Sequence, residues 1–404
     1  MRPFAGRRIL LGVTGGIAAY KVAFVARSLV QAGALVDVVL TRSAREFIGA
    51  VTFEALTGRP VHTEFVAEGS ALDHIKLPRA AELIVVAPAT ADFLARVATG
   101  QASDLLTASL LAAEPGCPVL LVPAMNDRMW DAASVRANVA ALRSRGYHVL
   151  EPDTGPLAST LEGSGAGRMP EPPAIVAHAA RLLESPSLTG KRVLITAGPT
   201  REPLDPVRFL SNHSSGKMGV ALAEAAWRRG AEVTLIAGPL AVPIPTGGVT
   251  VVSVETTEEM GAAVADALPT SDVLVMAAAP ADFRATDVAP EKIKKGSAAP
   301  TLALTHTPDI LASTIGARKP GAVIVGFALE TTDVLAHGRA KLDRKELDLI
   351  VINDATEPGA GFGGDTNRVT LLARGGEPEP LALMPKAEVA EAILDRVEAL
   401  QRGR

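Results

Sequence analysis

Short apolar runs rich in valine, isoleucine and leucine recur along the whole chain and alternate with segments of helical pattern. Such runs are typical of parallel strands that are buried on both faces and connected by helices. In the first half we expect strands at RRILLGV, ALVDVVLT, AELIVVAP, CPVLLVPA and YHVL. In the second half we expect strands at KRVLITAG, AEVTLIAG, VTVVSV, DVLVMAAA, AVIVGFAL and DLIVIND.

The pattern is interrupted near the middle, where residues 154–172 read TGPLASTLEGSGAGRMPEP. One helix follows at AIVAHAARLLES, and the strands restart after Pro186. The 404 residues also exceed the roughly 250 to 300 at which a single core stops growing. We therefore predict an α/β protein made of two doubly wound domains.

The two halves contain similar strand endings, ELIVVAPATADF at 82–93 and DVLVMAAAPADF at 272–283. Each puts an aspartate, Asp92 or Asp282, just beyond the carboxyl end of a buried strand, where open parallel sheets bind ligands. The same position also suits an ordinary helix cap. Both roles stay open for each aspartate.

Charge and composition narrow the class of partner. The chain has 40 Lys and Arg against 44 Asp and Glu, a formal net charge of -4, and no block of like charge. This balance gives no electrostatic footprint for nucleic acid and favours small-molecule substrates. The single cysteine, Cys117, allows no disulfide framework or thiolate zinc cluster within the chain and fits a reducing compartment.

The N-terminal sequence has to be distinguished from a secretory signal, because Arg7 and Arg8 precede the apolar stretch ILLGVTGGIAA. Lys21 and a glycine cluster interrupt that stretch, and no run reaches the roughly 18 apolar residues of a membrane span. We expect a soluble, cytoplasmic protein without a membrane partner.

The first chemical motif is GVTGGIAAYK, residues 12–21, between an expected strand and an expected helix. Glycines there let backbone amides approach a phosphate, and the start of a helix favours negative charge. The GxGxxG spacing is absent, and the next strand ends in Thr41 instead of the acidic residue that holds a nicotinamide nucleotide's ribose. A hydroxyl at that place suits a phosphate. The motif therefore favours a mononucleotide, although a tight turn alone would also require glycines.

Two more segments of the first half carry candidate chemistry. LDHIKL contains His74, and a lone histidine is more often structural than catalytic. PAMN, residues 123–126, ends another expected strand, where Asn126 can offer an amide to a substrate carboxylate and Met125 can line a flat ring. Taken alone, PAMN is equally a strand that ends in a turn.

The second half contains a long polar loop after a strand, AGPTREPLDPVRFLSNHSSGKMG at 197–219. Loops of this length are uncommon unless they are functional. The alternative is a polar surface loop without a function. Lys217 can neutralise charge, and Asn212 and His213 can reach a reacting group. No acidic residue follows the next strand, so a mononucleotide fits better than a dinucleotide. Small residues that suit a phosphate-binding turn at a helix start are Ser214, Ser215, Gly216 and Gly219.

Lysines of two later segments, APEKIKKG and AKLDRKELDLI, are candidates for the same site. Lysines in such runs usually lie on the solvent-exposed surface and have no specific role. Lys292, however, follows Asp282 in a stretch with little regular pattern, and Lys341 and Lys345 are one helical turn apart on one face. A triphosphate site needs several such cations.

Together these segments resemble a known family, the bifunctional phosphopantothenoylcysteine decarboxylase/phosphopantothenate–cysteine ligase of coenzyme A biosynthesis. Its flavin-dependent decarboxylase half is similar to this chain at GGIAAYK, DHIKL, APATAD, ARVATGQASDLL, PAMN and GxGRMPEP. Its ligase half is similar at ITAGPTREPLDPVRFLSNHSSGKMG, ADF before APEKIKK, TPDIL, GFALET and AKLDRKELDLIVIND. The resemblance implies a flavodoxin-like FMN-dependent decarboxylase domain at 1–184, a linker at 185–190, and a Rossmann-like nucleotide-binding ligase domain at 191–404.

In the first half the resemblance implies decarboxylation of phosphopantothenoylcysteine to 4'-phosphopantetheine. The cysteinyl thiol is oxidised to a thioaldehyde, carbon dioxide leaves, and the resulting enethiolate is reduced again, so that the flavin is returned unchanged. His74 matches the family's active-site base, and Asn126 matches its carboxylate-binding residue. The residues placed against FMN are Gly15, Gly16, Ile17, Ala18, Thr41, Ala89, Thr90, Asp92 and Met125.

In the second half the resemblance implies CTP-dependent ligation of 4'-phosphopantothenate with cysteine through an acyl-cytidylate. Asn212 would help to form or stabilise that intermediate, and Mg²⁺ is expected to bridge phosphates, with no ligand residue assigned. Asn353 and Asp354, with the loop at 359–367, would border the substrate or form a structural turn. The residues implied to hold CTP are Asp282, Lys292, Pro308, Asp309, Ile310, Leu311, Phe327, Lys341 and Lys345.

One position departs from the family's pattern. The family's flap normally reads Leu-Ala-Cys-Gly, whereas this chain reads Leu-Ala-Ser-Thr, with Ser159 at the catalytic position of the cysteine. A serine hydroxyl is a far weaker acid than a thiol, so the final reduction is in question while decarboxylation is not. Three outcomes stay open. Another group donates the proton in place of the cysteine, the product is released as the enethiol, or the activity of the first half is impaired. We interpret residues 154–172 as a substrate-covering flap in which Gly163, Gly165 and Gly167 allow closure.

Two rival interpretations differ in class. A two-domain nicotinamide oxidoreductase is weakened by the missing acidic residue after both second strands, and a flavin-binding protein with a regulatory role would need no catalysis. The resemblance also implies a homo-oligomer in which trimeric decarboxylase units are joined by ligase dimers.

Overall fold

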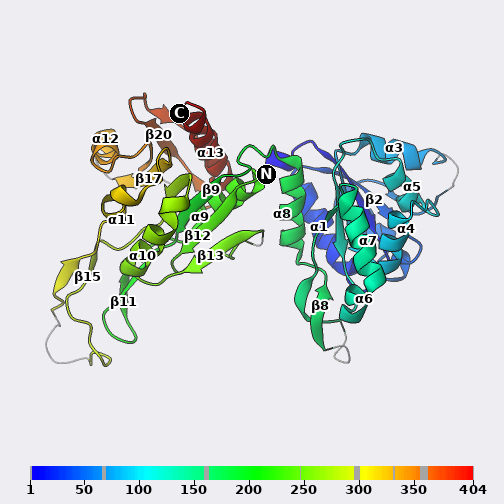
Figure 1. Ribbon diagram of the computed structural model, residues 1–404, viewed down its shortest axis with the longest axis horizontal. Coiled ribbons are helices and arrows are strands. Elements are labelled where there is room, and N and C mark those ends of the chain that lie inside the picture. Colours follow the sequence, from blue (N-terminus) through cyan, green and yellow to red (C-terminus); the bar gives the residue numbers. More distant parts are fainter. Residues whose placement is uncertain are drawn as a thin grey trace. The chain divides into compact units, whose positions relative to one another are not determined.

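The computed structural model describes residues 2–65, 70–158, 163–245, 247–294, 301–330, 333–354 and 363–403, with the backbone alone for Arg2, Glu330 and Asp354. The chain divides into two compact units, Met1–Ser185 and Pro186–Arg404. Each unit contains a large sheet with helices packed against it (Figure 1). Within the described ranges no helix is both long and apolar enough to cross a bilayer.

The first unit is built on a six-stranded parallel sheet in the order β3-β2-β1-β4-β5-β6. All strands expected in this half are present, and β3 is an addition too short for its pattern to be recognised. The strands are β1 (Arg8–Val13), β2 (Leu35–Leu40), β3 (Val61–His62), β4 (Leu83–Ala89), β5 (Val119–Pro123) and β6 (His148–Val149). The helices are α1 (Ala19–Gln31), α2 (Ala50–Thr57), α3 (Asp73–Ala80), α4 (Ala91–Ala98), α5 (Leu105–Leu111), α6 (Asp127–Asp131), α7 (Ala133–Ser144) and α8 (Pro172–Leu183).

Alternate residues of the first sheet pack into two separate cores. Ile9 and Leu11 of β1 belong to the core that contains Ile175 of α8. Leu10, between them, belongs to the core that contains Phe93 of α4. Full burial of each such side chain stabilises the fold by roughly 1.5 to 3 kcal/mol. The continuous apolar runs therefore require helices on both faces of the sheet, as the sequence pattern predicted.

The segment expected to act as a flap forms a β-hairpin. β7 (Asp153–Pro156) pairs antiparallel with β8 (Ser164–Arg168). Ser159 belongs to the connecting residues 159–162, which lie outside the described residues. Two prolines occupy the first helical positions of α8 directly after the hairpin, where missing N–H groups cost no helical hydrogen bond.

The second unit is built on an eight-stranded sheet in the order β13-β12-β9-β14-β17-β18-β20-β21. The expected strands are present and parallel, and β20 and β21 add an antiparallel edge that was not predicted. The sheet strands are β9 (Arg192–Ala197), β12 (Glu232–Ala237), β13 (Val249–Ser253), β14 (Val273–Met276), β17 (Val323–Glu330), β18 (Leu349–Asp354), β20 (Val369–Ala373) and β21 (Glu379–Pro380). The helices are α9 (Lys217–Arg228), α10 (Thr257–Ala267), α11 (Ile310–Ser313), α12 (Val334–Arg344) and α13 (Lys386–Arg402).

Both large sheets reverse their strand order beside their first strand, between β1 and β4 and between β9 and β14. Flavodoxin has the order 2-1-3-4-5, whereas the first unit here has the order 3-2-1-4-5-6 of dinucleotide-binding sheets. Either order opens a crevice at the carboxyl ends of the strands where it reverses. Two doubly wound α/β domains are confirmed, each with one such crevice.

Buried ion pairs join α9 to α13 in the second unit. Arg228 and Arg229, each 6% exposed, both pair with Glu391 of α13, and Arg229 Nη2 lies 2.6 Å from Glu391 Oε2. Arg229 Nη1 also lies 2.7 Å from Glu398 Oε1, which accepts the Ser187 hydroxyl at 2.7 Å. Residues of the expected linker thus contact the second unit.

Short strand pairs extend from the second unit as two arms (Figure 1). One arm is β10 (Arg201–Pro203) with β11 (Phe209–Ser211), and the other is β15 (Phe283–Ala285) with β16 (Leu304–His306). A further pair joins β19 (Thr366–Asn367) to β22 (Met384–Pro385). The arms expose apolar side chains at Val207, Phe209, Phe283, Leu302 and Leu304.

Candidate functional site

A pocket of about 550 Å³ lies in the first unit at the carboxyl ends of β1, β4 and β5. A pocket of this size suits a small organic ligand such as a mononucleotide. The glycine turn, the PAMN segment and the hairpin form its walls. The predicted site residues that it brings together are Gly15, Gly16, Ile17, Ala18, Thr90, Met125 and Asn126.

The glycines of the turn have different physical roles. A Cβ on Gly15 would lie 2.4 Å from Ser43 Cβ, so the turn can pack against the segment after β2 only without a side chain. A Cβ on Gly16 would come no nearer than 3.9 Å to Pro88 and Thr90, so this position faces open space. No side chain caps the first turn of α1. The Ala19 and Lys21 N–H groups donate to the Gly16 and Ala18 carbonyls, so the amides of the preceding turn, Gly16 to Ala18, are the ones that can serve an anionic ligand.

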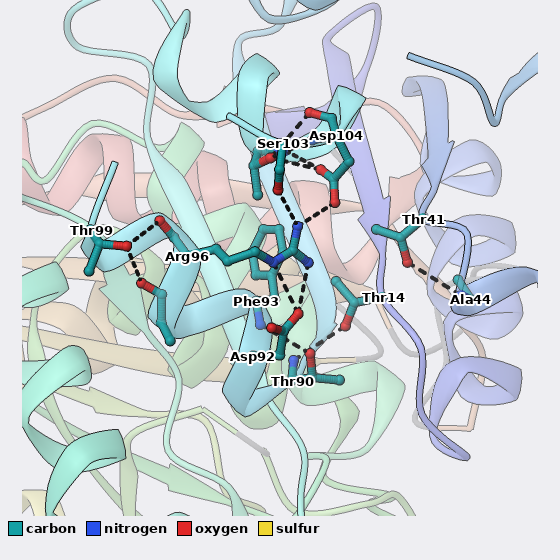
Figure 2. A network of polar contacts seen from close by, with 12 residues as sticks. Thr14, Thr41, Ala44, Thr90, Asp92, Phe93, Arg96, Thr99, Ser103 and Asp104 are labelled. Atoms are coloured by element: carbon teal, nitrogen blue, oxygen red, sulfur yellow. Dashed lines mark hydrogen bonds and ion pairs between the residues drawn. The ribbon is translucent and has the colours of Figure 1, made fainter. Parts of the chain in front are cut away.

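Thr14, inside the glycine motif, contacts two residues that line the pocket, and Figure 2 shows it beside Thr90. Its Oγ1 donates to the Pro88 carbonyl at 2.6 Å and accepts the Thr90 N–H at 3.2 Å. Thr90 Oγ1 in turn accepts the Phe93 N–H at 3.3 Å and caps α4. These contacts fix the end of β4 against the end of β1. A single threonine after a strand carries no signal that would have revealed this role.

Asp92 does not line the pocket, because its side chain lies on the exposed side of α4 (Figure 2). Its Oδ2 lies 3.0 Å from Nη2 of Arg96, one turn further along the helix. Arg96 also donates to Asp104 Oδ2 at 2.5 Å, and Asp104 caps α5. Burial opposes ionisation of Asp104, but hydrogen bonds from Arg96 and Thr107 lower its pKa. Thr90 is the cap of α4, Asp92 belongs to a surface network, and its implied place beside FMN stays a prediction.

The PAMN segment and the hairpin contact one another through their backbones. The Met125 N–H donates to the Gly167 carbonyl at 3.0 Å. A Cβ on Gly167 would lie 2.2 Å from the Met125 carbonyl oxygen, and one on Gly165 would lie 2.5 Å from Asp127 Oδ2. These two glycines allow close packing of β8, whereas Gly163, with a φ of 73°, allows a turn.

Asn126 is fixed at the wall of the pocket as the N-cap of α6. Its Oδ1 accepts the Arg128 N–H at 3.0 Å. Arg168 lines the same pocket and pairs with Glu171, whose Oε1 also lies 2.9 Å from Lys21 Nζ. These cations were not predicted, since isolated lysines and arginines have no diagnostic spacing.

Besides Asp92, three predicted residues lie outside the lining of this pocket. Thr41 is buried, and its Oγ1 accepts the Ala44 N–H at 3.3 Å (Figure 2). Ala89 is buried in β4. The ring of His74, on α3, meets that of Phe65 edge-on at a centroid separation of 5.7 Å. Its buried Nδ1 has no hydrogen-bond partner within the described part of the chain.

A second pocket, of about 580 Å³, lies in the second unit around the carboxyl ends of β9, β14 and β17. Asn212 lines it, whereas Lys292 is exposed and lies outside its lining. The other residues predicted to hold CTP all meet there: Asp282, Pro308, Asp309, Ile310, Leu311, Phe327, Lys341 and Lys345.

The serine- and glycine-rich turn of this pocket leads directly into α9. Gly216 is the N-cap of the helix and has a φ of 81°, which favours glycine. A Cβ on Gly219 would lie 2.5 Å from Ala197 Cβ, so the helix packs directly against the end of β9. No side chain caps α9. Its first amides can therefore serve a phosphate, as in the first unit.

Asn212 bridges two loops of the second pocket. Its Nδ2 donates to the carbonyls of Ala279 and Pro280 at 3.1 and 2.9 Å. Asp282 follows on the same loop and lines the pocket. The amide thus fixes the loop after β14 relative to the turn before α9.

Lys345 is held in place by Asp309, with 2.9 Å between Nζ and Oδ2. Burial opposes ionisation of Asp309, but hydrogen bonds from Lys345 and from the Ala312 N–H lower its pKa. Asp309 also caps α11. The ion pair therefore couples the position of the lysine to that of the segment 308–311.

Lys386 lines the second pocket without having been predicted, whereas Asn367, which also lines it, belongs to the loop 359–367 that was expected to border the substrate. Lys386 is 7% exposed, and burial together with the nearby charge of Lys217 lowers its pKa. Asn367 Oδ1 accepts from Asn353 Nδ2 at 3.4 Å. A lysine in the first turn of a helix opposes the helix dipole, which is the only signal that would have drawn attention to Lys386.

The described ranges contain no group of three or more His, Cys, Asp or Glu side chains that could hold a metal ion. The expected Mg²⁺ therefore stays a prediction without an assigned ligand residue.

Comparisons with known proteins cover both units. Residues 2–184 match the family Flavoprotein, and residues 188–400 match the DNA/pantothenate metabolism flavoprotein C-terminal domain. The chain is 49% identical to the coenzyme A biosynthesis bifunctional protein CoaBC of Mycobacterium tuberculosis, over 98% of this chain and 97% of that protein. It is 44% identical to the CoaBC protein of Bacillus subtilis, over 98% of each. A solved C-terminal domain of a CoaBC protein is 40% identical, with a TM-score of 0.46 over 55% of this chain and 100% of that one.

Proposed function

The chain belongs to the family of bifunctional coenzyme A biosynthesis proteins, and from this premise we propose that each pocket carries one of two consecutive reactions. The second pocket joins 4'-phosphopantothenate to cysteine with the use of CTP. The first pocket decarboxylates the product, phosphopantothenoylcysteine, to 4'-phosphopantetheine. The observation that carries the proposal is the presence of two crevices at strand-order reversals, each opening on a helix start that no side chain caps.

The first pocket fits FMN. The open space at Gly16, the uncapped start of α1 and a volume of about 550 Å³ suit a mononucleotide. The turn Gly15–Ala18 would hold the phosphate, and Thr90 and Met125 would lie along the rest of the cofactor. When bound, FMN supplies the two-electron oxidation of the cysteinyl thiol that makes loss of carbon dioxide easy.

The chain's own residues hold the decarboxylation substrate. Asn126, whose oxygen caps α6, would donate from its amide nitrogen to the substrate carboxylate. The hairpin lines the pocket through Pro156, Leu157 and Ala158 and would exclude water. Ser159 decides whether the product leaves saturated. Mass analysis of the product from phosphopantothenoylcysteine tests this, because the enethiol is lighter than the thiol by two hydrogens.

In the second pocket the carboxylate of 4'-phosphopantothenate attacks CTP, and the amine of cysteine then displaces CMP. Lys341, Lys345 and the segment 308–311 would hold the nucleotide, with Phe327 on β17 beside it. Asn212 would hold the reacting groups against the loop after β14. Mg²⁺ would enter with the nucleotide and be bound mainly by phosphate oxygens, since no cluster of metal-binding side chains occurs in the described ranges.

We further propose a homo-oligomer. The apolar side chains that the arms expose suit ligase dimers with a second copy of the chain. Trimeric decarboxylase units would give His74 access to the pocket of another copy, since it does not line its own. Light scattering at micromolar concentration tests both, and a monomer would contradict them. The cytoplasmic location expected from the sequence stays a prediction.

The decisive experiment incubates the purified full-length protein with 4'-phosphopantothenate, cysteine and CTP. We expect pyrophosphate, CMP and carbon dioxide, with a bound yellow chromophore in the protein. If the protein releases no CMP and no pyrophosphate, the ligase assignment is refuted. A colourless protein that depends on a nicotinamide nucleotide would refute the decarboxylase assignment in favour of an oxidoreductase.

A further inference from the structure

Two lysines from distant parts of the chain meet at one wall of the second pocket. Lys217 is the first residue of α9, and Lys386 is the first residue of α13. Both line the pocket, and their ammonium groups converge on residues 363–365. Lys217 Nζ lies 2.9 Å from the Gly363 carbonyl oxygen and 2.6 Å from Asp365 Oδ1, and Lys386 Nζ lies 2.7 Å from the Gly364 carbonyl oxygen.

This convergence of positive charge is unfavourable by itself. Each lysine stands at the start of a helix, where the helix dipole opposes a cation. Lys386 is nearly buried, and burial together with Lys217 lowers its pKa. Asp365 supplies one compensating carboxylate, but its side chain is 90% exposed. An electropositive wall of this kind is stabilised when a multiply charged anion enters the pocket.

We propose that Lys217 and Lys386 form a subsite for the pyrophosphate part of the nucleotide, and that Asp365 occupies Lys217 until that anion arrives. The proposal rests on the proposed ligase function. Ser214, Ser215 and Gly216 connect Asn212 to Lys217 along the wall of the pocket. With the reacting α-phosphate at Asn212, this turn leads the β- and γ-phosphates to the two lysines.

The chemistry of the first ligase step requires cations at this place. A carboxylate oxygen of 4'-phosphopantothenate forms a bond to the α-phosphorus of CTP, and the bond from that phosphorus to the α–β bridging oxygen breaks. The electron pair of the broken bond stays on the departing pyrophosphate, whose negative charge rises. The two ammonium groups stabilise this charge, while the Asp365 carboxylate turns to solvent and returns when pyrophosphate dissociates.

Binding of inorganic pyrophosphate to the full-length protein, measured by calorimetry with Mg²⁺ present, tests the subsite. Lys386→Gln and Lys217→Gln retain a donor for the carbonyls of residues 363–364 but remove the charge. Each is expected to weaken pyrophosphate binding about 10- to 100-fold and to raise the KM for CTP, with the KM for cysteine unchanged. Asp365→Asn is expected to tighten pyrophosphate binding by up to about fivefold, because it removes the competing carboxylate.

Lys319→Gln is the matched control, since Lys319 pairs with Asp272 and lies outside the pocket lining. Lys386→Arg keeps the charge and should restore binding, which separates a charge effect from a folding defect. The proposal would be overturned if Lys386→Gln bound pyrophosphate as tightly as the wild-type protein does. It would also be overturned if Asp365→Asn bound pyrophosphate more weakly than the wild-type protein does. A higher KM for cysteine alone would also overturn it and would assign the lysines to the amino acid carboxylate. Failure of the ligase function is distinct, because the wild-type protein would then release no CMP.

Discussion

The two pockets occupy the same topological position but differ in charge. The turn of the first pocket is made of Gly15, Gly16, Ile17 and Ala18, and two cations that line this pocket, Lys21 and Arg168, share the single carboxylate of Glu171. The second pocket is lined by Lys217, Lys341, Lys345 and Lys386, of which Lys217 pairs with Asp365 and Lys345 with Asp309. A cofactor that returns unchanged can be held by fixed backbone amides, whereas a triphosphate that is cleaved changes its charge during the reaction. Under the proposed function, the comparison indicates that a retained nucleotide and a consumed one require different electrostatics at the same position of the fold.

The largest effect is expected from a crossed pair of substitutions. In Asn212→Asp the new carboxylate would face the carbonyls of Ala279 and Pro280, so ligation should fall by about 10²- to 10³-fold or more. In Asn126→Asp the helix cap is retained, but the new charge would repel the substrate carboxylate, so decarboxylation should fall by a similar factor. Assays of CMP and carbon dioxide release measure both.

Each variant of the crossed pair serves as the control for the other. Asn212→Asp should still decarboxylate supplied phosphopantothenoylcysteine, and Asn126→Asp should still form it. Loss of both activities in one variant would show that the pockets depend on one another, and the comparison would then have to be abandoned.

The next effect concerns the hairpin of β7 and β8, which lines the first pocket. Gly167→Ala would place a Cβ 2.2 Å from the Met125 carbonyl oxygen and force β8 away from the PAMN segment. Such overpacking costs about 1 to 3 kcal/mol, so flavin binding should weaken about 10-fold or more while ligation is unchanged. Fluorescence titration of FMN measures it. Gly163→Asn, at a turn with a φ of 73° that asparagine tolerates, should bind FMN normally.

A smaller effect is expected from salt. Raising the ionic strength from about 0.1 M to about 1 M shortens the Debye length from roughly 10 Å to roughly 3 Å. The KM for CTP should rise by about three- to tenfold because lysines line that pocket, while FMN affinity should change by less than about twofold. Equal salt dependence at both pockets would contradict the electrostatic difference.

The smallest effect concerns pH. Because its pKa is lowered from the reference value of 10.5, Lys386 loses its proton at a lower pH than an ordinary lysine. CTP affinity should therefore be full below that lowered pKa and fall by about two- to fivefold as the pH rises through it. Lys386→Arg stays charged and should abolish the alkaline loss. Identical profiles of KM against pH for the two proteins would count against this role of Lys386.

The strands could be predicted because burial on both faces leaves a direct trace in the sequence, as at Ile9 to Leu11. Val61–His62 is too short to show such a pattern, and the antiparallel strand at Val369–Ala373 is followed by glycine and proline instead of a helix. Very short strands and antiparallel strands are therefore missed when the search is for buried parallel strands.

Site residues could be predicted where a strand end and a helix start lie next to each other in the sequence, as at Gly16, Asn126 and Asn212. Lys386 could not be predicted, because the packing of α13 on α9 alone brings it to Lys217. The repeated ADF motif has a different geometry in the two halves: Asp282 lines its pocket, whereas Asp92 points to the surface. Local sequence identifies the carboxyl end of a strand but not the direction of each side chain there.

The buried arginines of α9 also bear on how the protein is made. The first unit is a continuous segment that can fold while synthesis proceeds. Arg229, by contrast, needs Glu391, which follows 162 residues later. At about 5 to 20 residues per second, a ribosome needs roughly 8 to 30 seconds to reach it. During that interval two arginines destined for burial lack their carboxylate, so the second unit completes its core only after α13 has emerged.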